Sequence, residues 1–322
     1  MAARLRAPRR EPARLLGAER LPHARRPLDR GALLRPGDAR DAADARRGRT
    51  QASRPLSAPV RVTALVLLVA ATSSAGCLTL LAGNEAPLER VWQATHVWLP
   101  PGVGPENANG RPVRELESLL DSIAAPKALP AVIYAHGCRG LDDDLAQWAG
   151  VLAAAGYAVF APDALARGDR PPPCAASRLY QRTDLAGFGR READIRYVLR
   201  QMLTLRWVAP ESIFLLGFDH GGVVAAGWRE REFAGFIVTG WTCTSPDVRG
   251  GLLTPPDRPV LAIRWADDPL FRDPAWNGDC EVHLPPRPGS RSLVLEGLGH
   301  STAANPQARE GVLRFLRAHT VR

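Results

Sequence analysis

Residues 217–222 place an acidic side chain where hydrolases carry their nucleophile. The sequence reads Gly217-Phe-Asp219-His-Gly-Gly222, and it follows the apolar run Ser212–Gly217 and precedes a stretch of small residues. A strand, a sharp glycine-bounded turn and a helix in this order form a nucleophile elbow, which holds its central side chain up on a strained turn. Serine is the usual central residue, and Asp219 takes its place here.

Two further groups follow in the order that a catalytic triad on such an elbow requires. Asp267 and Asp268 come after the apolar run Val260–Trp265, and His300 comes after the run Ser292–Glu296. Nucleophile, acid and histidine follow one another along the chain, each at the carboxyl end of a strand. His300 would act as the base, and the acid would orient it through the other ring nitrogen.

Backbone N–H groups must stabilise the negative charge that develops during such a reaction. They come from the residue after the nucleophile and from a loop after an earlier strand. Here these are the N–H of His220 and an N–H in the segment His136-Gly-Cys138-Arg-Gly140, after the run Ala131–Ala135, and we assign it to Cys138. The alternative is that the glycines only form a tight turn.

From about residue 88 the chain alternates strand and helix patterns. Apolar runs predict strands at Val91–Leu99, Ala131–Ala135, Tyr157–Ala161, Ser212–Gly217, Gly235–Gly240, Val260–Trp265 and Ser292–Glu296. Helices are predicted at Asp143–Ala155, Arg191–Trp207, Gly221–Arg231 and Asn305–Ala318. This alternation predicts a doubly wound α/β sandwich with a mostly parallel sheet. The connection from Gly240 to Pro259 has no room for a helical cap domain.

The basic charge is concentrated at the start of the chain. Residues 1–61 hold 16 arginines and six acidic residues, a net charge of +10, whereas the whole chain carries +9. The rest is close to neutral, so the high isoelectric point predicts no nucleic-acid surface. Residues 1–60 have seven prolines and no Phe, Trp or Tyr. We expect a disordered Arg/Pro-rich extension or a mis-assigned start, with a basic arm for anionic lipid or nucleic acid as the alternative.

Residues 61–83 have the pattern of a targeting segment. Arg61 is followed by an apolar run and then by small residues that end in Ser74-Ala-Gly-Cys77. This is a secretory signal pattern, and the last four residues are similar to a bacterial lipoprotein cleavage box. The uncharged segment is also long enough for a transmembrane anchor, and a buried core helix is a further alternative. We expect an exported protein that is periplasmic, membrane-anchored through residues 61–83, or secreted.

Cysteine usage agrees with export. Apart from Cys77, the chain contains Cys138, Cys174, Cys243 and Cys280. An even number in an exported chain suggests disulfides, with buried free thiols as the alternative. No Cys-x-x-Cys pair or His/Cys cluster at zinc-finger spacing occurs in the sequence. We therefore predict no metal and no other cofactor.

Four segments together resemble the dienelactone hydrolase-like group of α/β-hydrolases. They are Tyr134-Ala-His-Gly-Cys-Arg-Gly140, Ala161-Pro-Asp-Ala164, Gly240-Trp-Thr-Cys243 and Gly297-Leu-Gly-His300. The similarity spans about residues 90–320. It implies one α/β-hydrolase domain, residues 88–322, without a cap, which hydrolyses ester or lactone bonds of small molecules.

The same resemblance assigns individual residues. It implies that Asp268, which precedes a proline, is the triad acid rather than Asp267. It also implies two disulfide pairs, Cys138 with Cys174 and Cys243 with Cys280.

Asp219 departs from this family, whose nucleophile is Ser or Cys. The elbow is instead similar to those of epoxide hydrolases and haloalkane dehalogenases, which use aspartate. A carboxylate that attacks an ester carbonyl forms an anhydride, whereas attack on an sp³ carbon that bears a halide, or on an epoxide carbon, forms an alkyl ester. Those families hold a leaving-group donor in or near a cap, and His220 stands where their elbows often have Trp. Candidate substitutes for that donor are Tyr180, Trp241 and Trp265.

Two functions fit these residues. The first is an exported hydrolase that acts on a small ester, lactone or related molecule through Asp219, Asp268 and His300, by way of an alkyl-ester intermediate. The second is a catalytically inactive binding protein on the same fold. A hydrogen bond between Asp219 and His300 would favour the first.

Overall fold

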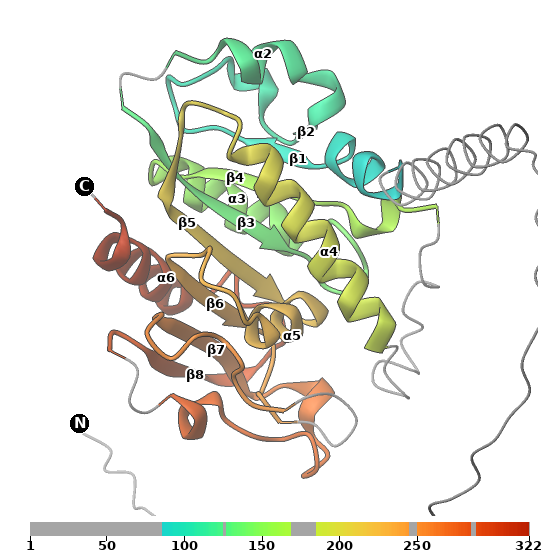
Figure 1. Ribbon diagram of the computed structural model, residues 1–322. Helices are drawn as coiled ribbons and strands as arrows, with labels where there is room; N and C mark the ends of the chain where they lie inside the picture. Colours follow the sequence, from blue (N-terminus) through green and yellow to red (C-terminus); the bar gives the residue numbers. More distant parts are fainter. Residues whose placement is uncertain (1–85, 125–126, 169–184, 245–249, 285–287, 322) are drawn as a thin grey trace, which may run out of the picture. The chain divides into compact units, whose positions relative to one another are not determined.

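The computed structural model (Figure 1) describes residues 86–124, 127–168, 185–244, 250–284 and 288–321. The chain divides into two units, residues 1–59 and 60–322, and all described residues belong to the second. The predicted extension 1–60 and the predicted targeting segment 61–83 lie outside the described residues. Within the described ranges, no helix combines the length and the apolar character needed to cross a membrane.

The described residues build one sheet of eight strands in the order β2-β1-β4-β3-β5-β6-β7-β8 (Figure 1). The strands are β1 His96–Trp98, β2 Arg111–Pro112, β3 Leu129–Ala135, β4 Ala158–Ala161, β5 Val208–Phe218, β6 Gly235–Thr239, β7 Val260–Asp267 and β8 Arg291–Leu298. Strand β1 pairs antiparallel with β2 and β4, and the other pairs are parallel. The central strands β5 and β6 are buried on both faces, which explains their continuous apolar sequences.

Helices cover both faces of this sheet, as Figure 1 shows. Helices α3 (Asp143–Ala154) and α6 (Pro306–His319) pack on one face, and α4 (Leu185–Met202) and α5 (His220–Gly227) pack on the other. The short α2 (Glu117–Ser122) contributes to the same core as α4 and α5. The predicted three-layer α/β sandwich with a mostly parallel sheet is therefore confirmed.

Side-chain caps fix the starts of the two helices on the first face. Asp142 precedes α3, and its carboxylate accepts a hydrogen bond from the Asp144 N–H. Asn305 precedes α6, and its side-chain oxygen accepts from the N–H groups of Gln307 and Ala308. Such caps satisfy backbone donors that have no partner inside the helix.

The predicted strand Val91–Leu99 is wrong over its first part. Residues 86–93 are helical, and strand β1 contains only His96–Trp98. Trp92 stacks on Phe160 with ring centroids 6.3 Å apart, so the apolar residues before β1 form a buried face of a helix. An apolar run of this length fits either element until its tertiary partner is known.

Two predicted helices have different ends in the structure. Helix α4 starts at Leu185 and ends at Met202, where Arg191–Trp207 was expected. Helix α5 ends at Gly227 rather than at Arg231, because Trp228 turns to extended backbone and packs edge-on against Phe233. Strand β2 and helix α2 were not predicted. Between β6 and β7, the described residues 240–244 and 250–259 contain no helix, in agreement with the expected lack of a cap there.

Candidate active site

The turn between β5 and α5 places Asp219 on a strained backbone. Its φ is 54° and its ψ is −115°, a region that residues other than glycine seldom adopt. A Cβ at Gly217 would lie 2.0 Å from the Gly221 carbonyl oxygen, and one at Gly221 would lie 1.9 Å from the carbonyl oxygen of Ala135. Both glycines are therefore required for the close approach of backbone segments that makes this sharp turn.

Strand β6 holds the turn from the other side. The Asp219 N–H donates to the Thr239 carbonyl oxygen at 3.0 Å, and the Thr239 hydroxyl donates to the Gly217 carbonyl oxygen at 3.1 Å. These bonds fix the backbone on both sides of Phe218. The Asp219 side chain therefore has a defined direction.

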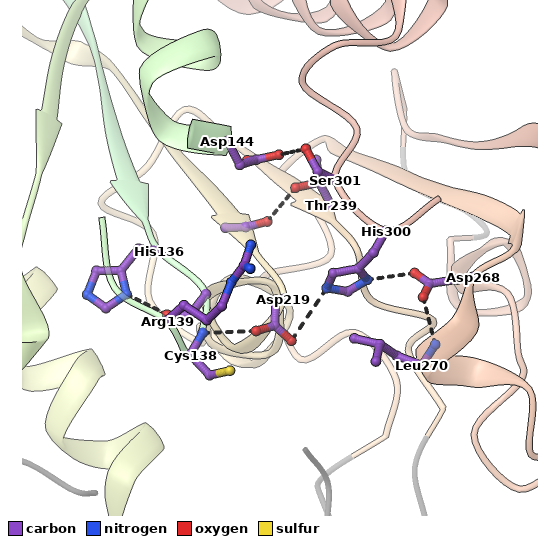
Figure 2. Close-up of polar contacts among 12 residues, drawn as sticks. His136, Cys138, Arg139, Asp144, Asp219, Thr239, Asp268, Leu270, His300 and Ser301 are labelled. Carbon is purple, nitrogen blue, oxygen red and sulfur yellow. Dashed lines mark hydrogen bonds and ion pairs between the residues drawn. The ribbon is translucent and has the colours of Figure 1, made fainter. Parts of the chain in front are cut away.

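Two backbone N–H groups bond to the Asp219 carboxylate, which is only 4% exposed, and Figure 2 shows the contact from Cys138. The Cys138 N–H donates to Oδ2 at 2.9 Å, and the His220 N–H also bonds to the carboxylate. Burial raises the pKa of Asp219, but the nearby His220 and His300 and the two backbone hydrogen bonds outweigh it, so the pKa lies below the ordinary value. The carboxylate is ionised at neutral pH.

His300 lies between Asp219 and Asp268 (Figure 2). Its Nδ1 is 2.7 Å from Oδ2 of Asp268, and its Nε2 is 3.8 Å from Oδ1 of Asp219. The second distance is an ion-pair contact and is longer than a hydrogen bond. Asp268 is buried, and its Oδ1 accepts from the Leu270 N–H at 3.0 Å, which fixes the carboxylate. Asp267, by contrast, is exposed at the end of β7.

The imidazole of His300 is a stronger base than a free histidine. Burial lowers the pKa of His300, but the hydrogen bond that Nδ1 donates to Asp268 and the negative charges of Asp219, Asp268 and Asp144 raise it above the ordinary value. The ring lies against Phe218, with centroids 5.0 Å apart, and 6.2 Å from Phe271.

A buried acid supports the loop that carries His300. Asp144, on α3, accepts hydrogen bonds from the Tyr134 hydroxyl at 2.6 Å and from the Ser301 hydroxyl. Burial raises the pKa of Asp144, and these hydrogen bonds oppose that rise. The network ties the residue after His300 to strand β3 and helix α3. Sequence reasoning did not find it, because its members are far apart in the chain.

The predicted segment His136–Gly140 lies beside the elbow, and its backbone is held by buried groups. The Ala164 N–H donates to His136 Nε2 at 3.0 Å, so Nε2 is unprotonated and Nδ1 carries the proton. His136 Nδ1 lies 2.6 Å from the Gly137 carbonyl oxygen, to which it donates. Burial and the nearby Arg191 lower the pKa of His136 to about 3, so its ring is neutral.

Cys138 is also disulfide-bonded, and its predicted partner Cys174 lies outside the described residues. The predicted pair Cys243–Cys280 is present as a disulfide. A sulfur of Cys138, an oxygen of Asp219 and a ring nitrogen of His220 lie within 4.8 Å of one another. Because a disulfide sulfur is not a thiolate, this cluster lacks the donor set of a metal site.

Of the three candidate leaving-group donors, Trp241 and Trp265 make contacts that hold the fold together. Trp241 is 1% exposed, and its ring packs edge-on against Phe271 at 5.9 Å. The Trp265 indole N–H donates to the Ser301 carbonyl oxygen at 2.8 Å. Both indoles therefore serve packing and loop support, while Tyr180 lies outside the described residues.

The sheet order, the elbow and the position of His300 define an α/β-hydrolase fold. A model of the dienelactone hydrolase family matches residues 119–236. That span contains the elbow and the His136–Gly140 segment, but neither Asp268 nor His300. No curated protein matches the chain.

Solved structures with similar folds include three esterase-type proteins. Esterase PE8 is 20% identical, over 60% of this chain and 94% of that chain, with a TM-score of 0.45. A cold-adapted esterase from an Arctic intertidal metagenomic library is 16% identical, over 62% and 86%, with a TM-score of 0.45. A phospholipase/carboxylesterase from Dyadobacter fermentans is 15% identical, over 70% and 96%, also with a TM-score of 0.45.

Proposed function

We propose that this chain is a hydrolase of the dienelactone hydrolase-like type in which Asp219 forms a covalent alkyl ester with a small substrate. One observation carries the proposal. Oδ2 of Asp219 accepts the Cys138 N–H at 2.9 Å, while Oδ1 faces Nε2 of His300. Oδ2 is therefore held by a backbone donor, and Oδ1 is directed toward His300, the proposed base.

In the first step, Oδ1 of Asp219 attacks an sp³ carbon of the substrate. The new C–O bond forms as the bond from that carbon to its leaving group breaks, and the leaving group takes the electron pair. A halide or a carboxylate leaves as the anion, still tethered in the case of a lactone, whereas an epoxide oxygen remains attached and takes a proton from solvent water. An ionised carboxylate is required, in agreement with the lowered pKa of Asp219. The product of this step is a neutral alkyl ester on Asp219.

In the second step, water hydrolyses that ester at Cγ of Asp219. Nε2 of His300 takes a proton from the water, and the hydroxide adds to Cγ. The charge that develops on Oδ2 meets the N–H groups of Cys138 and His220, which bond to the carboxylate in the resting site. The bond from Cγ to Oδ1 then breaks, His300 returns the proton, and the substrate leaves as an alcohol.

The charge of Asp219 also controls the protonation state of His300 during the reaction. In the free enzyme this charge raises the pKa of His300. Alkylation removes it, so the pKa of His300 falls in the intermediate and the neutral, basic imidazole becomes more populated. Formation of the alkyl ester on Asp219 thus also favours the neutral imidazole of His300, which is the form that can take a proton from water.

The substrate class follows from the nucleophile. Attack of a carboxylate on an acyl carbon would give an anhydride, so Asp219 is suited to alkyl carbon. Suitable substrates are small epoxides, alkyl halides, and esters or lactones that are cleaved at their alkyl carbon.

The alternative is a binding protein that has lost catalysis. The missing serine at position 219 favours it. The 3.8 Å between His300 Nε2 and Asp219 Oδ1 does not, since catalytic contacts often tighten only when substrate is bound. Asp268 and His300 also have the order and contacts of a working site, which an inactive protein does not require.

A single turnover in ¹⁸O-water, with enzyme in excess over an epoxide, halide or ester, tests the proposal, and an inactive binding protein would give no product. Alkyl catalysis places ¹⁸O in the Asp219 carboxylate and leaves the first alcohol unlabelled. Direct attack by water would leave Asp219 unlabelled; it would label the alcohol from a halide or epoxide, and the acid from an ester attacked at its acyl carbon. Asp219→Asn should abolish turnover, and full activity in that variant would show that Asp219 is not the nucleophile. Esterase activity in Asp219→Ser would show that the rest of the site is intact.

We further propose that the protein is exported, through residues 61–83. The Cys243–Cys280 disulfide supports this, because disulfides persist in oxidising compartments. Fractionation of expressing cells, combined with thiol labelling, tests it. Recovery of the chain in the cytoplasm with free Cys243 and Cys280 would contradict export.

A further inference from the structure

Arg191 on α4 is a partly buried cation that bonds to backbone carbonyls instead of to a carboxylate. Its Nη1 donates to the His136 carbonyl oxygen at 2.7 Å, and its Nη2 donates to the Gly137 carbonyl oxygen at 3.2 Å. Within the described ranges it forms no ion pair within 4 Å with any carboxylate, whereas Arg167 and Arg196 of the same region do. Burial lowers the pKa of Arg191, and the charges of Asp219, Asp194 and Asp163 oppose this, so the carboxylates act on the guanidinium from a distance while the backbone carbonyls hold it directly.

Those two carbonyls belong to the loop that supplies the N–H bond to Asp219. In a trans peptide the C=O and the following N–H point in opposite directions. The Gly137 carbonyl oxygen points toward Arg191 and His136, so the Cys138 N–H of the same peptide points the other way, at Oδ2 of Asp219. The donors on one side of this peptide therefore set the direction of the donor on the other.

His136 also holds this peptide in place through a hydrogen bond. Its Nδ1–H donates to the Gly137 carbonyl oxygen at 2.6 Å, and the Ala164 N–H fixes the tautomer that allows it. Gly137 itself has little room to change, since a Cβ there would lie 3.0 Å from Oδ2 of Asp219. The Gly137 carbonyl oxygen thus accepts from His136 Nδ1, from Arg191 Nη2 and from the Gly140 N–H at 3.3 Å.

We infer that Arg191 is a positioning residue, which with His136 keeps the Gly137–Cys138 peptide turned so that the Cys138 N–H addresses the Asp219 carboxylate. Its positive charge beside the carbonyl also polarises the peptide and strengthens the N–H as a donor. The catalytic part of this inference rests on the proposed function, while its geometric part concerns the peptide alone. Without Arg191, the Gly137 carbonyl oxygen loses one of the donors that hold it, so the Cys138 N–H is less firmly directed at Asp219.

The geometric part is tested without any substrate. The Cys138 amide is followed by NMR, through its proton chemical shift and its hydrogen exchange, in the full chain. Asp219→Ala gives the reference spectrum for the lost hydrogen bond. In Arg191→Met, the Cys138 amide should move upfield toward that reference and exchange faster, and Arg191→Lys, which cannot bond both carbonyls in the same plane, should lie between.

Arg200→Met is the matched control, because Arg200 is an exposed arginine on the same helix. It should leave the Cys138 amide unchanged. If the amide in Arg191→Met and Arg191→Lys behaves as in wild type, the inference is wrong. Should Arg191→Met fail to fold, Arg191→Lys and Arg191→Gln provide the same comparison.

The catalytic part is tested by the kinetic constants. Loss of one donor should lower kcat of Arg191→Met by about 10²-fold with KM nearly unchanged, because the donor acts on charge that develops only during reaction. An effect on KM alone would assign Arg191 to substrate binding and overturn the inference. If the ¹⁸O experiment excludes Asp219 as nucleophile while the Cys138 amide responds to Arg191→Met, the proposed function fails and the geometric inference stands.

Discussion

Nδ1 of His300 and Oδ2 of Asp268 are 2.7 Å apart, and this contact distinguishes Asp268 from the adjacent Asp267. Asp268→Asn removes the charge that orients the imidazole and stabilises its protonated form. We expect kcat to fall by about 10⁴-fold, as when the acid of a hydrolase triad is replaced. Asp267→Asn is the matched control and should keep near-wild-type kcat, because Asp267 is exposed. Steady-state kinetics of the two variants, on any substrate identified in the single-turnover screen, measures these effects. Similar losses of kcat in both variants would contradict the assignment of Asp268 as the triad acid.

The charge of Asp219 should be visible in the titration of His300. Burial lowers the pKa of His300, while Asp268 and Asp219 raise it, to a net value above the ordinary one. Asp219→Asn removes one raising charge, so the pKa of His300 should be lower in the variant than in wild type. NMR titration of the His300 ring proton measures this difference. His319, in α6, is the internal control, and its titration should not move.

His136 should make the folded state sensitive to acid. The pKa of His136 is about 3 in the folded protein, because of burial and Arg191, against an ordinary value of 6.5. Between these values the unfolded chain binds the additional proton, so the free energy of unfolding falls as the pH falls. One proton contributes up to about 1.4 kcal/mol per pH unit, and this loss begins below pH 6.5.

His136→Gln removes that titration. Urea denaturation between pH 4 and 6.5 should show a shallower pH dependence in the variant, by about 1 kcal/mol per unit. The comparison uses slopes, so the lower absolute stability of His136→Gln does not matter. Equal slopes in the two proteins would mean that His136 is protonated in the folded state.

Two glycines should respond in opposite ways to alanine. At Gly221 the added Cβ would lie 1.9 Å from the Ala135 carbonyl oxygen, so β3 and α5 must separate. We expect Gly221→Ala to destabilise the fold by about 3 kcal/mol or more. Gly150 is an exposed residue of α3 with nothing within 4 Å of the added Cβ, and Gly150→Ala should stabilise by about 0.5–1 kcal/mol. Thermal denaturation measures both, and equal effects would mean that the elbow tolerates a side chain.

The residues of the candidate site could be predicted because they stand at the ends of elements with clear patterns. Asp219 lies between a buried strand and small residues, and His300 follows a strand near the carboxyl terminus. Spacing alone did not decide whether Asp267 or Asp268 is the triad acid, and the choice between them came from a family resemblance. The structure separates them physically, since one carboxylate is buried against His300 and the other faces solvent.

The supporting residues could not be predicted in this way. Arg191 looks like a solvent-facing residue of an amphipathic helix, and only the peptide planes at His136 and Gly137 show its contacts. Asp144 and Ser301 are 157 positions apart in the chain, so no local pattern connects them. The error at Val91–Leu99 has a similar origin, because Phe160, a distant residue, decides that this apolar run begins as a helix.

The backbone angles of Asp219 bear on why an acid occupies this turn. A side chain at φ 54° and ψ −115° costs about 1–3 kcal/mol, which glycine would largely avoid. For folding alone, glycine would be more favourable at position 219, yet the chain has there an ionised carboxylate that accepts from two backbone donors. The elbow is therefore a local cost to the stability of the fold, and the side chain that causes this cost is the one that the proposed mechanism uses as its nucleophile.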